Sequence, residues 1–209
     1  MVERYLSKGT SGTVSQARWQ GMAVAVKKYY FVDDGSANSA AMLASFKNEV
    51  FLMRQLQHGN LVRFFGASDI APNLCIVMDY AAGGDLQHFL DRRKAADAPL
   101  TDKQVLGVLV QLLGAVAHCH QRSVLHRDIK PSNVLIAETG HIKLADFGLS
   151  TSMMQHKKCG TLPYVAPEVL CDGSASEALD HWAVGVLLYE LIAGEPPFRG
   201  STPKQMLQN

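Results

Sequence analysis

The 209-residue sequence lacks the features that mark several classes of protein. Its four cysteines lie far apart and form no Cys-x-x-Cys pair, which argues against a zinc site and against a disulfide framework. The formal charge is +1, and no basic run indicates binding to nucleic acid or to an anionic membrane. No internal repeat is present. With 47% apolar residues, the chain is long enough to bury one large core or two smaller ones.

Long apolar runs are also missing. The most apolar stretches, residues 105–117 and 182–192, are shorter than the roughly 20 residues that cross a bilayer. Each is interrupted by a polar residue, Gln111 or Glu190. The N-terminus has no basic segment followed by an apolar one. We therefore expect buried helices, no membrane insertion and a reduced, cytoplasmic compartment.

The first third of the chain alternates short β-type runs with glycine and contains one helical stretch. The helix is expected over about residues 42–56, because apolar residues recur there at helical spacing. The expected strands cover residues 15–19, 22–29, 61–65 and 74–78. This pattern predicts a small antiparallel sheet with one helix laid on it.

After Ala81-Ala82-Gly83-Gly84 the pattern changes to long helical runs. Helices are expected over residues 85–94, 101–120 and 179–193, with short β segments around residues 134 and 142. Thr101 and Gln104 form a capping-box pattern. The sequence therefore predicts an α+β protein with lobes at residues 1–80 and 81–209, and a ligand in the cleft between them.

A glycine-containing segment, Gly9-Thr10-Ser11-Gly12-Thr13-Val14, follows the first β signal. Glycines let a hairpin turn lie close enough for backbone N–H groups to face phosphate oxygens. Ser7 stands where the first glycine of a phosphate-binding triad is expected, and a plain hairpin turn is the commoner explanation of an isolated match. This segment alone does not decide the function.

The apolar run Val24-Ala25-Val26 ends at Lys27. A buried cation needs a negative partner or a phosphate, and Glu49 lies on the helix that follows. We expect Lys27 and Glu49 to form an ion pair. The alternative is a surface lysine on an edge strand.

Three motifs then follow in order: His126-Arg127-Asp128-Ile129-Lys130-Pro131-Ser132-Asn133, Asp146-Phe147-Gly148, and Ala166-Pro167-Glu168. They resemble the catalytic loop, the metal-binding triplet and the end of the activation segment of protein kinases. With Lys27 and Glu49 upstream, the resemblance covers essentially the whole chain. The sequence is therefore identified as a member of the protein kinase family.

This resemblance implies ATP and Mg²⁺ as cofactors and gives individual residues a role. Asp128 resembles the catalytic base that orients the substrate hydroxyl, and Lys130 would help to neutralise the γ-phosphate. Asn133 and Asp146 resemble the magnesium ligands, and Lys27 resembles the lysine on the α- and β-phosphates. Taken singly, Asp128 and Asn133 also suit ordinary turns and Lys130 a solvated surface, so the shared order of the motifs carries these assignments.

Other positions match nucleotide contacts of the family. The segment Met78-Asp79-Tyr80-Ala81 resembles the hinge whose backbone receives adenine, with Met78 as gatekeeper. Asp85 stands where an acidic residue commonly contacts ribose, and a helix N-cap explains it equally well. The remaining candidates for ATP binding are Gly9, Gly12, Val14 and Ala25.

Packing positions of the family are matched as well. Phe64, Met53, Phe147 and His126 match the stacked apolar spine of active kinases. Asp180 and Trp182 resemble the start of the central buried helix, where the aspartate ties down the catalytic loop.

Lys130 and the segment Gly160-Thr161-Leu162-Pro163-Tyr164 resemble serine/threonine kinases, so protein substrates with serine or threonine acceptors are expected. Thr161 and Glu190 are assigned to the substrate and activation region. Asp85 and Glu190 stand where acidic residues bind a basic residue upstream of the acceptor. The N-lobe resembles the tyrosine-kinase-like branch with the mixed-lineage kinases, whereas the C-lobe resembles calmodulin-dependent and checkpoint kinases.

Two departures qualify the resemblance. Lys157 stands where many relatives carry a phosphorylatable threonine, so pairing of such a phosphate with Arg127 is not expected. The family domain normally continues for several more helices, with an arginine that pairs with the glutamate matched by Glu168. We therefore expect an incomplete domain. The alternatives are an inactive fragment or a pseudokinase-like binding module, although the usual hallmark of the latter, loss of residues such as Lys27 or Asp128, is missing.

Overall fold

The computed structural model describes residues 2–9, 12–152, 160–171 and 176–207. By its internal contacts the chain forms two compact units, which are described separately. The first unit comprises residues 1–57 and 62–81, and the second comprises residues 58–61 and 82–209.

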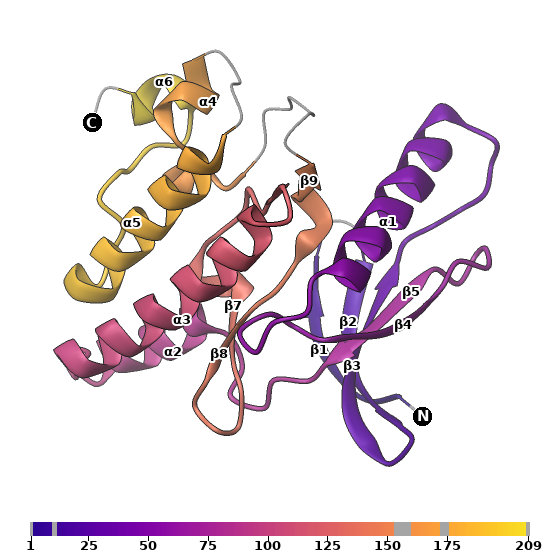
Figure 1. The fold of residues 1–209 in the computed structure, drawn as a ribbon, viewed down its shortest axis with the longest axis horizontal. Coiled ribbons are helices and arrows are strands. Elements are labelled where there is room, and N and C mark those ends of the chain that lie inside the picture. Colours follow the sequence, from indigo (N-terminus) through magenta and orange to yellow (C-terminus); the bar gives the residue numbers. More distant parts are fainter. Residues whose placement is uncertain (1, 10–11, 153–159, 172–175, 208–209) are drawn as a thin grey trace. The chain divides into compact units, whose positions relative to one another are not determined.

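The first unit is built on a five-stranded sheet in the order β1-β2-β3-β5-β4, in which all neighbours are antiparallel (Figure 1). The strands are β1 (Val2–Lys8), β2 (Gly12–Trp19), β3 (Met22–Tyr29), β4 (Phe64–Ser68) and β5 (Cys75–Asp79). Helix α1 (Ala37–Gln55) packs on this sheet, and its Phe46 ring meets the Tyr29 ring of β3 edge-on at 5.1 Å. Phe46, Leu52 and Met53 are the buried apolar side chains of α1, which explains why the helix is held there.

Helix α1 begins five residues before the predicted start, at Ala37 instead of residue 42. Ser36 caps it by accepting a hydrogen bond from the backbone N–H of Ser39 at 3.1 Å. The first turn of the helix carries small and polar residues, so its start leaves no apolar periodicity in the sequence.

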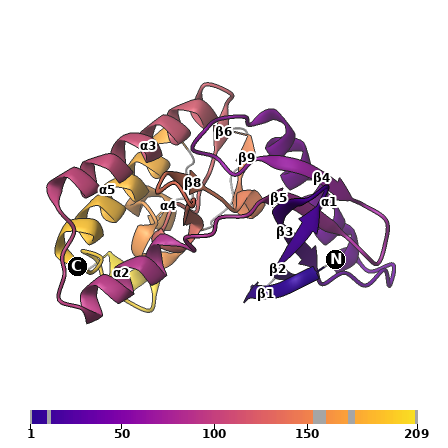
Figure 2. The ribbon, with the colours of Figure 1, turned by 90° about the horizontal axis from the view of Figure 1, so that it is seen from below.

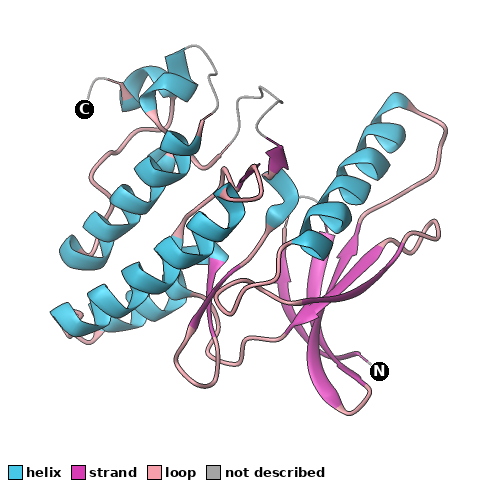
Figure 3. Ribbon diagram, viewed as in Figure 1, coloured by secondary structure: helices cyan, strands magenta, loops and turns pink. Residues whose placement is uncertain are grey.

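The second unit is mainly helical, with two small two-stranded sheets (Figure 3). Its helices are α2 (Leu86–Ala95), α3 (Asp102–His120), α4 (Pro167–Cys171), α5 (Glu177–Ala193) and α6 (Pro203–Met206). Strand β6 (Val124–Leu125) pairs with β9 (Thr151–Ser152), and β7 (Val134–Ile136) pairs with β8 (Ile142–Leu144). Three 3₁₀ turns complete it: η1 (Pro131–Asn133), η2 (Phe147–Leu149) and η3 (Leu162–Tyr164). The predicted α+β class is confirmed.

Helices α3 and α5 pack side by side and form the core of the second unit (Figure 2). Leu112 and Ala115 of α3 and Leu187 of α5 are at most 1% exposed. The predicted capping box is present, because Thr101 and Gln104 each accept from the other's backbone N–H. None of the described helices has both the length and the apolar character needed to cross a bilayer.

The predicted strand over residues 61–65 is wrong at its start. Strand β4 begins at Phe64, whereas residues 58–61 belong to the second unit. There Asn60 donates from Nδ2 to Gln111 Oε1 and to the carbonyl of Ile142, each at 2.9 Å. A short apolar run does not reveal which strand it pairs with, and here Leu61, at 1% exposure, forms an isolated parallel bridge with Leu144 of β8 instead of joining β4.

The same segment places the ring of His58 against the ring of His118 on α3, with centroids 5.1 Å apart. The Arg122 guanidinium lies 3.3 Å from His118 Nδ1, and His118 Nε2 is buried with no hydrogen-bond partner among the described residues. Burial, followed by the charges of Arg122 and His58, lowers the pKa of His118 below its usual value.

This pair predicts an acid-sensitive stability. An unfolded histidine binds a proton near pH 6.5, whereas the folded chain resists protonation of His118. The free energy of unfolding should therefore fall as the pH drops below about 6.5, by at most about 1.4 kcal/mol per pH unit for one proton. His118→Phe keeps a ring at this position but cannot titrate. Urea unfolding between pH 7 and pH 5 should show that the free energy of unfolding depends less on pH in this variant. An equal pH dependence in both proteins would contradict the role of His118.

Candidate active site

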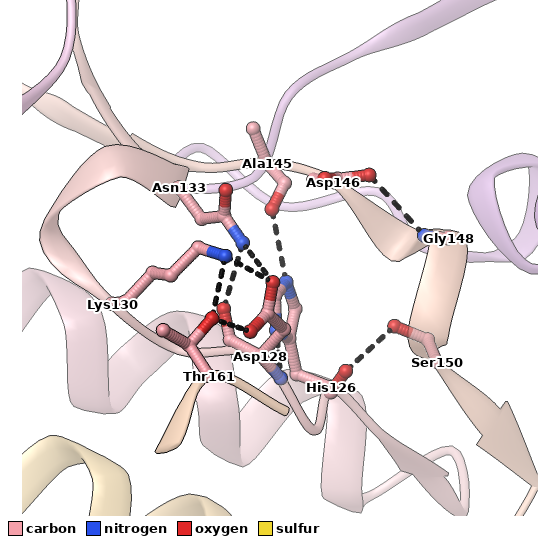
Figure 4. A network of polar contacts seen from close by, with 9 residues as sticks. All are labelled: His126, Asp128, Lys130, Asn133, Ala145, Asp146, Gly148, Ser150 and Thr161. Carbon is pink, nitrogen blue, oxygen red and sulfur yellow. Dashed lines mark hydrogen bonds and ion pairs between the residues drawn. The ribbon is translucent and has the colours of Figure 1, made fainter. Parts of the chain in front are cut away.

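The segment between β6 and β7 holds a compact polar network around the carboxylate of Asp128 (Figure 4). Lys130 Nζ lies 2.7 Å from Asp128 Oδ2, and Thr161 Oγ1 donates to Asp128 Oδ1 at 2.8 Å. Lys130 Nζ also donates to Thr161 Oγ1 at 2.7 Å. Asn133 Nδ2 donates to Asp128 Oδ2 at 2.9 Å and to its carbonyl at 2.8 Å. One cation and two neutral donors therefore fix a carboxylate that is 7% exposed.

A buried aspartate holds the backbone of this loop. Asp180, at the start of α5, is fully buried and accepts from the backbone N–H of His126 at 2.9 Å and of Arg127 at 2.8 Å. His120 Nε2 donates to Asp180 as well, at 2.8 Å. Burial alone would raise the pKa of Asp180, but the hydrogen bond from His120 and those from the loop backbone hold this pKa below its usual value. The predicted tie between Asp180 and the loop is confirmed.

The Asp146 turn lies next to the same loop. The backbone N–H of Ala145 donates to the carbonyl of Asn133 at 2.8 Å, so Asn133 and Asp146 are brought together by backbone pairing. Asp146 itself has φ 67°, in the left-handed region that few residues other than glycine adopt. Its Oδ1 accepts from the N–H of Gly148 at 3.4 Å. Such strain often marks residues with a functional constraint.

The oxygen atoms here fit a magnesium ion. The bonds from Asn133 Nδ2 to Asp128 fix the amide, and Figure 4 shows the amide oxygen of Asn133 on the side away from Asp128. With the Asp146 carboxylate, this gives one carbonyl and one carboxylate donor, the hard oxygen ligands that Mg²⁺ prefers. The residue types therefore suit the predicted metal.

In the first unit, Lys27 and Glu49 form the predicted ion pair. Lys27 Nζ lies 2.8 Å from Glu49 Oε1, and the two side chains are 12% and 4% exposed. Tyr29 donates from its hydroxyl to Glu49 Oε2 at 2.6 Å. Burial raises the pKa of Tyr29 far above its usual value, so the hydroxyl stays protonated and acts as a donor.

The Lys27–Glu49 pair predicts strong coupling between substitutions. Lys27→Met leaves a buried carboxylate without its cation, and Glu49→Gln leaves a buried cation, so each single change should cost about 3–5 kcal/mol of stability. The double variant should lose less than the sum of the single losses, with a coupling of about 0.5–3 kcal/mol. Chemical unfolding of the four proteins measures this. Lys28→Met, at the exposed neighbouring position, is the matched control. Additive losses would show that the pair does not act as a unit.

Of the glycine segment, Gly9 follows β1 and Gly12 begins β2. The N–H of Gly9 donates to the carbonyl of Gly12 at 2.9 Å, and Thr10 and Ser11 lie outside the described residues. A Cβ on Gly12 would come within 2.1 Å of the carbonyl oxygen of Lys28, so this position requires glycine for packing.

The other predicted nucleotide contacts lie on the sheet and just after it. Met78 on β5 is 8% exposed and pairs with Ala25 on β3, while Val14 on β2 pairs with Lys27. Asp79 ends β5 and Ala81 follows it as the last residue of the first unit. The roles of these residues in ATP binding stay predictions.

Asp85 is the N-cap of α2, accepting from the backbone N–H of His88 at 2.9 Å. Of its two interpretations, the helix cap is therefore confirmed, and contact with ribose stays a prediction.

Glu190 lies inside the second unit at 5% exposure and accepts a hydrogen bond from the Tyr164 hydroxyl. Burial raises the pKa of Glu190, against the lowering effect of the Tyr164 hydroxyl. Elsewhere in the second unit, the ring of Trp182 on α5 stacks on the ring of Phe198 with centroids 5.4 Å apart. Lys157, on which the activation prediction depends, is outside the described residues.

Of the predicted spine residues, His126 and Phe147 are in contact within the second unit, with ring centroids 5.1 Å apart and an edge-on geometry. Met53 and Phe64 lie in the first unit, where Met53 is 3% exposed. A continuous column through all four stays a prediction.

Comparison with known families decides the class of protein. The family described as protein kinase domain matches residues 1–209. The chain belongs to the protein kinase family. The predicted motifs and the predicted fold class thereby belong to one family, and two of the chain's plant relatives are named serine/threonine-protein kinases.

Curated relatives of this kinase domain include CBL-interacting protein kinase 28 of Oryza sativa subsp. japonica, which is 35% identical over 216 residues, covering 99% of this chain and 48% of the relative. Aurora kinase C of Mus musculus is 32% identical over 209 residues, with 98% and 73% covered. CBL-interacting serine/threonine-protein kinase 19 of Arabidopsis thaliana is 37% identical over 205 residues, with 93% and 41% covered. The chain thus spans about half the length of the plant relatives that it matches.

Sequence reasoning missed three side chains that contact this kinase site: Tyr29, His120 and Ser150. Tyr29 had a usable signal, since it lies two residues after Lys27 on a strand and therefore shares its face. His120 and Ser150 act across the chain, on Asp180 and on the carbonyl of His126, and no local spacing reveals such contacts.

Proposed function

We propose that this kinase domain transfers the γ-phosphate of Mg-ATP to serine and threonine hydroxyls of protein substrates. The observation that supports this most directly is the network in which Lys130, Asn133 and Thr161 all bind the Asp128 carboxylate. A carboxylate beside a lysine, held in place by an amide and a hydroxyl, has the composition that phosphoryl transfer requires.

Phosphoryl transfer depends on positioning and on neutralising the charge of the γ-phosphate oxygens. Asp128 would accept a hydrogen bond from the substrate hydroxyl, orient it and take its proton. The hydroxyl of Thr161 already occupies such a position at 2.8 Å from Asp128 Oδ1, which shows that the carboxylate accepts from a hydroxyl in this geometry. Lys130, 2.7 Å from the same carboxylate, would supply positive charge to the phosphoryl group.

Asn133 and Asp146 would hold the magnesium ion, which, when bound, supplies charge neutralisation to the phosphates. In the first unit, Lys27 would contact the α- and β-phosphates, and Glu49 would fix its ammonium group. The segment from Met78 to Ala81 would receive adenine through its backbone, as in the family.

The test is a transfer assay with γ-labelled ATP, Mg²⁺ and arrayed peptides that carry serine, threonine or tyrosine as the only acceptor. Label should appear on serine and threonine peptides and should require Mg²⁺. Nucleotide binding without transfer to any peptide would favour the pseudokinase-like alternative, and transfer to tyrosine alone would contradict the proposed specificity.

The same array tests the proposed preference for a basic residue before the acceptor. Asp85 and Glu190 would bind that residue, although in this structure each carboxylate also accepts a hydrogen bond within the chain. Enrichment of arginine or lysine in the positions before the acceptor is the expected outcome. Equal labelling of basic and neutral peptides would remove these two residues from substrate recognition.

A further inference from the structure

Ser150 lies four residues after Asp146, at the end of the η2 turn, and is 3% exposed. Its hydroxyl donates to the backbone carbonyl of His126 at 3.1 Å, across 24 residues of sequence (Figure 4). Its backbone N–H donates to the carbonyl of Phe147 at 3.1 Å and closes the turn. Ser150 thus joins the end of the Asp146 turn to the start of the catalytic loop.

The backbone at His126 is held on both sides by side chains. Its N–H donates to the buried carboxylate of Asp180, as described above, and its carbonyl accepts from the Ser150 hydroxyl. The next two residues are Arg127 and Asp128, so any rotation of the His126 carbonyl would move the loop that carries the proposed base. Asp180 therefore holds the N–H of His126, and Ser150 holds its carbonyl.

The His126 ring links the same two segments a second time. Its Nδ1 accepts from the backbone N–H of Asp128 at 3.3 Å, which leaves Nε2 to donate to the carbonyl of Ala145 at 3.0 Å. Ala145 directly precedes Asp146, and the Phe147 ring lies against the His126 ring. The imidazole fixes the start of the Asp146 turn, and Ser150 fixes its end.

We propose that Ser150 is a positioning residue, whose hydroxyl holds the strained Asp146 turn against the catalytic loop so that Asp146 and Asn133 present their oxygens to Mg²⁺ together. This rests on the proposed phosphotransfer function. Asp146 keeps φ 67° only while its surroundings hold it there. Without the Ser150 hydroxyl, one of the two fixed ends of the turn is released, and the metal-binding oxygens lose their set separation.

Two substitutions and one control test the proposal in the full chain. Ser150→Ala removes the hydroxyl, and Ser150→Cys keeps nearly the same volume but offers only a weak donor. Thr139→Ala removes a hydroxyl from the exposed turn between β7 and β8 and serves as the matched control.

The first measurement needs no nucleotide: amide hydrogen exchange across residues 146–150. Both Ser150 variants should exchange about five- to tenfold faster there, the effect of losing one ordinary hydrogen bond, while the control exchanges like the original chain. The second measurement is ADP binding with and without Mg²⁺. The Mg²⁺ concentration at half-maximal binding should rise about five- to tenfold, whereas ADP affinity without Mg²⁺ and the melting temperature should change little.

Each outcome decides one point. Unchanged exchange in both variants would overturn the proposal, and so would faster exchange with unchanged Mg²⁺ dependence, because Ser150 would then be only a packing residue. A Cys variant that behaves like the original chain would assign the effect to volume and not to the hydroxyl, which would also overturn it. If the original chain bound no Mg-ADP at all, the proposed function itself would fail, and the exchange measurement would still decide whether Ser150 holds the turn.

Discussion

Replacing Asp128 with asparagine is expected to lower the turnover of phosphotransfer by about two to four orders of magnitude, the usual contribution of a general base. The asparagine keeps the shape of the side chain but loses the charge that pairs with Lys130 at 2.7 Å, and its amide cannot take a proton from a substrate hydroxyl. The residues proposed to contact the nucleotide are unchanged. ATP affinity should therefore remain within a few-fold of the original value, so the loss appears in kcat.

The control for this experiment is Asp102→Asn, which removes the same charge from the exposed first turn of α3. It should leave turnover unchanged. Steady-state kinetics with a labelled peptide, together with ADP titration of each protein, separate the two effects. An Asp128 variant with normal turnover would remove this residue from its proposed role, and a variant that fails to bind nucleotide would show that the network around it is structural.

Replacing Asp180 with asparagine is expected to unfold the second unit at a markedly lower temperature. The carboxylate is fully buried and accepts from the N–H groups of His126 and Arg127 and from His120. An amide offers one acceptor oxygen and turns a donor toward these donors, so the expected loss is about 3–5 kcal/mol. For a chain of this size, each kcal/mol lowers the melting temperature by about 2–4 °C.

Glu177→Gln is the matched control for Asp180. Its carboxylate also approaches His120, at 3.7 Å, but the side chain is 47% exposed. Exposed pairs contribute little, so this change should alter the free energy of unfolding by less than about 1 kcal/mol. Calorimetry of both variants makes the comparison. Equal melting temperatures for the two would contradict the view that the buried carboxylate organises the catalytic loop.

Several features of the site could be predicted from the sequence because short segments fix them. The pairing of Lys27 with Glu49 follows from a lysine that ends an apolar run and an acid on the next helix. Asp128 and Asn133 were both assigned to the site by one motif, in which they stand five positions apart. Local spacing determines such features, so they can be predicted from a sequence pattern.

Other features could not be predicted, because they depend on contacts between distant segments. The role of Ser150 depends on a carbonyl 24 residues away, and a serine in a buried turn gives no signal of it. The placement of Leu61 was also wrong, since an apolar residue fits a strand and an isolated contact equally well. The early start of α1 was missed because Ser36 sets it by a cap and not by apolar periodicity.

Residues 58–61 can complete their contacts only late in the synthesis of the chain. Asn60 has its partner at Ile142, 82 residues further along the chain, and Leu61 bridges to Leu144. All five strands of the first unit are already complete at Asp79. At about 5–20 residues per second, synthesis of the 63 residues from Asp79 to Ile142 takes roughly 3–13 s. During that interval the sheet can form while Leu61 still lacks its cover, so this short segment is where a nascent chain would expose apolar surface to chaperones.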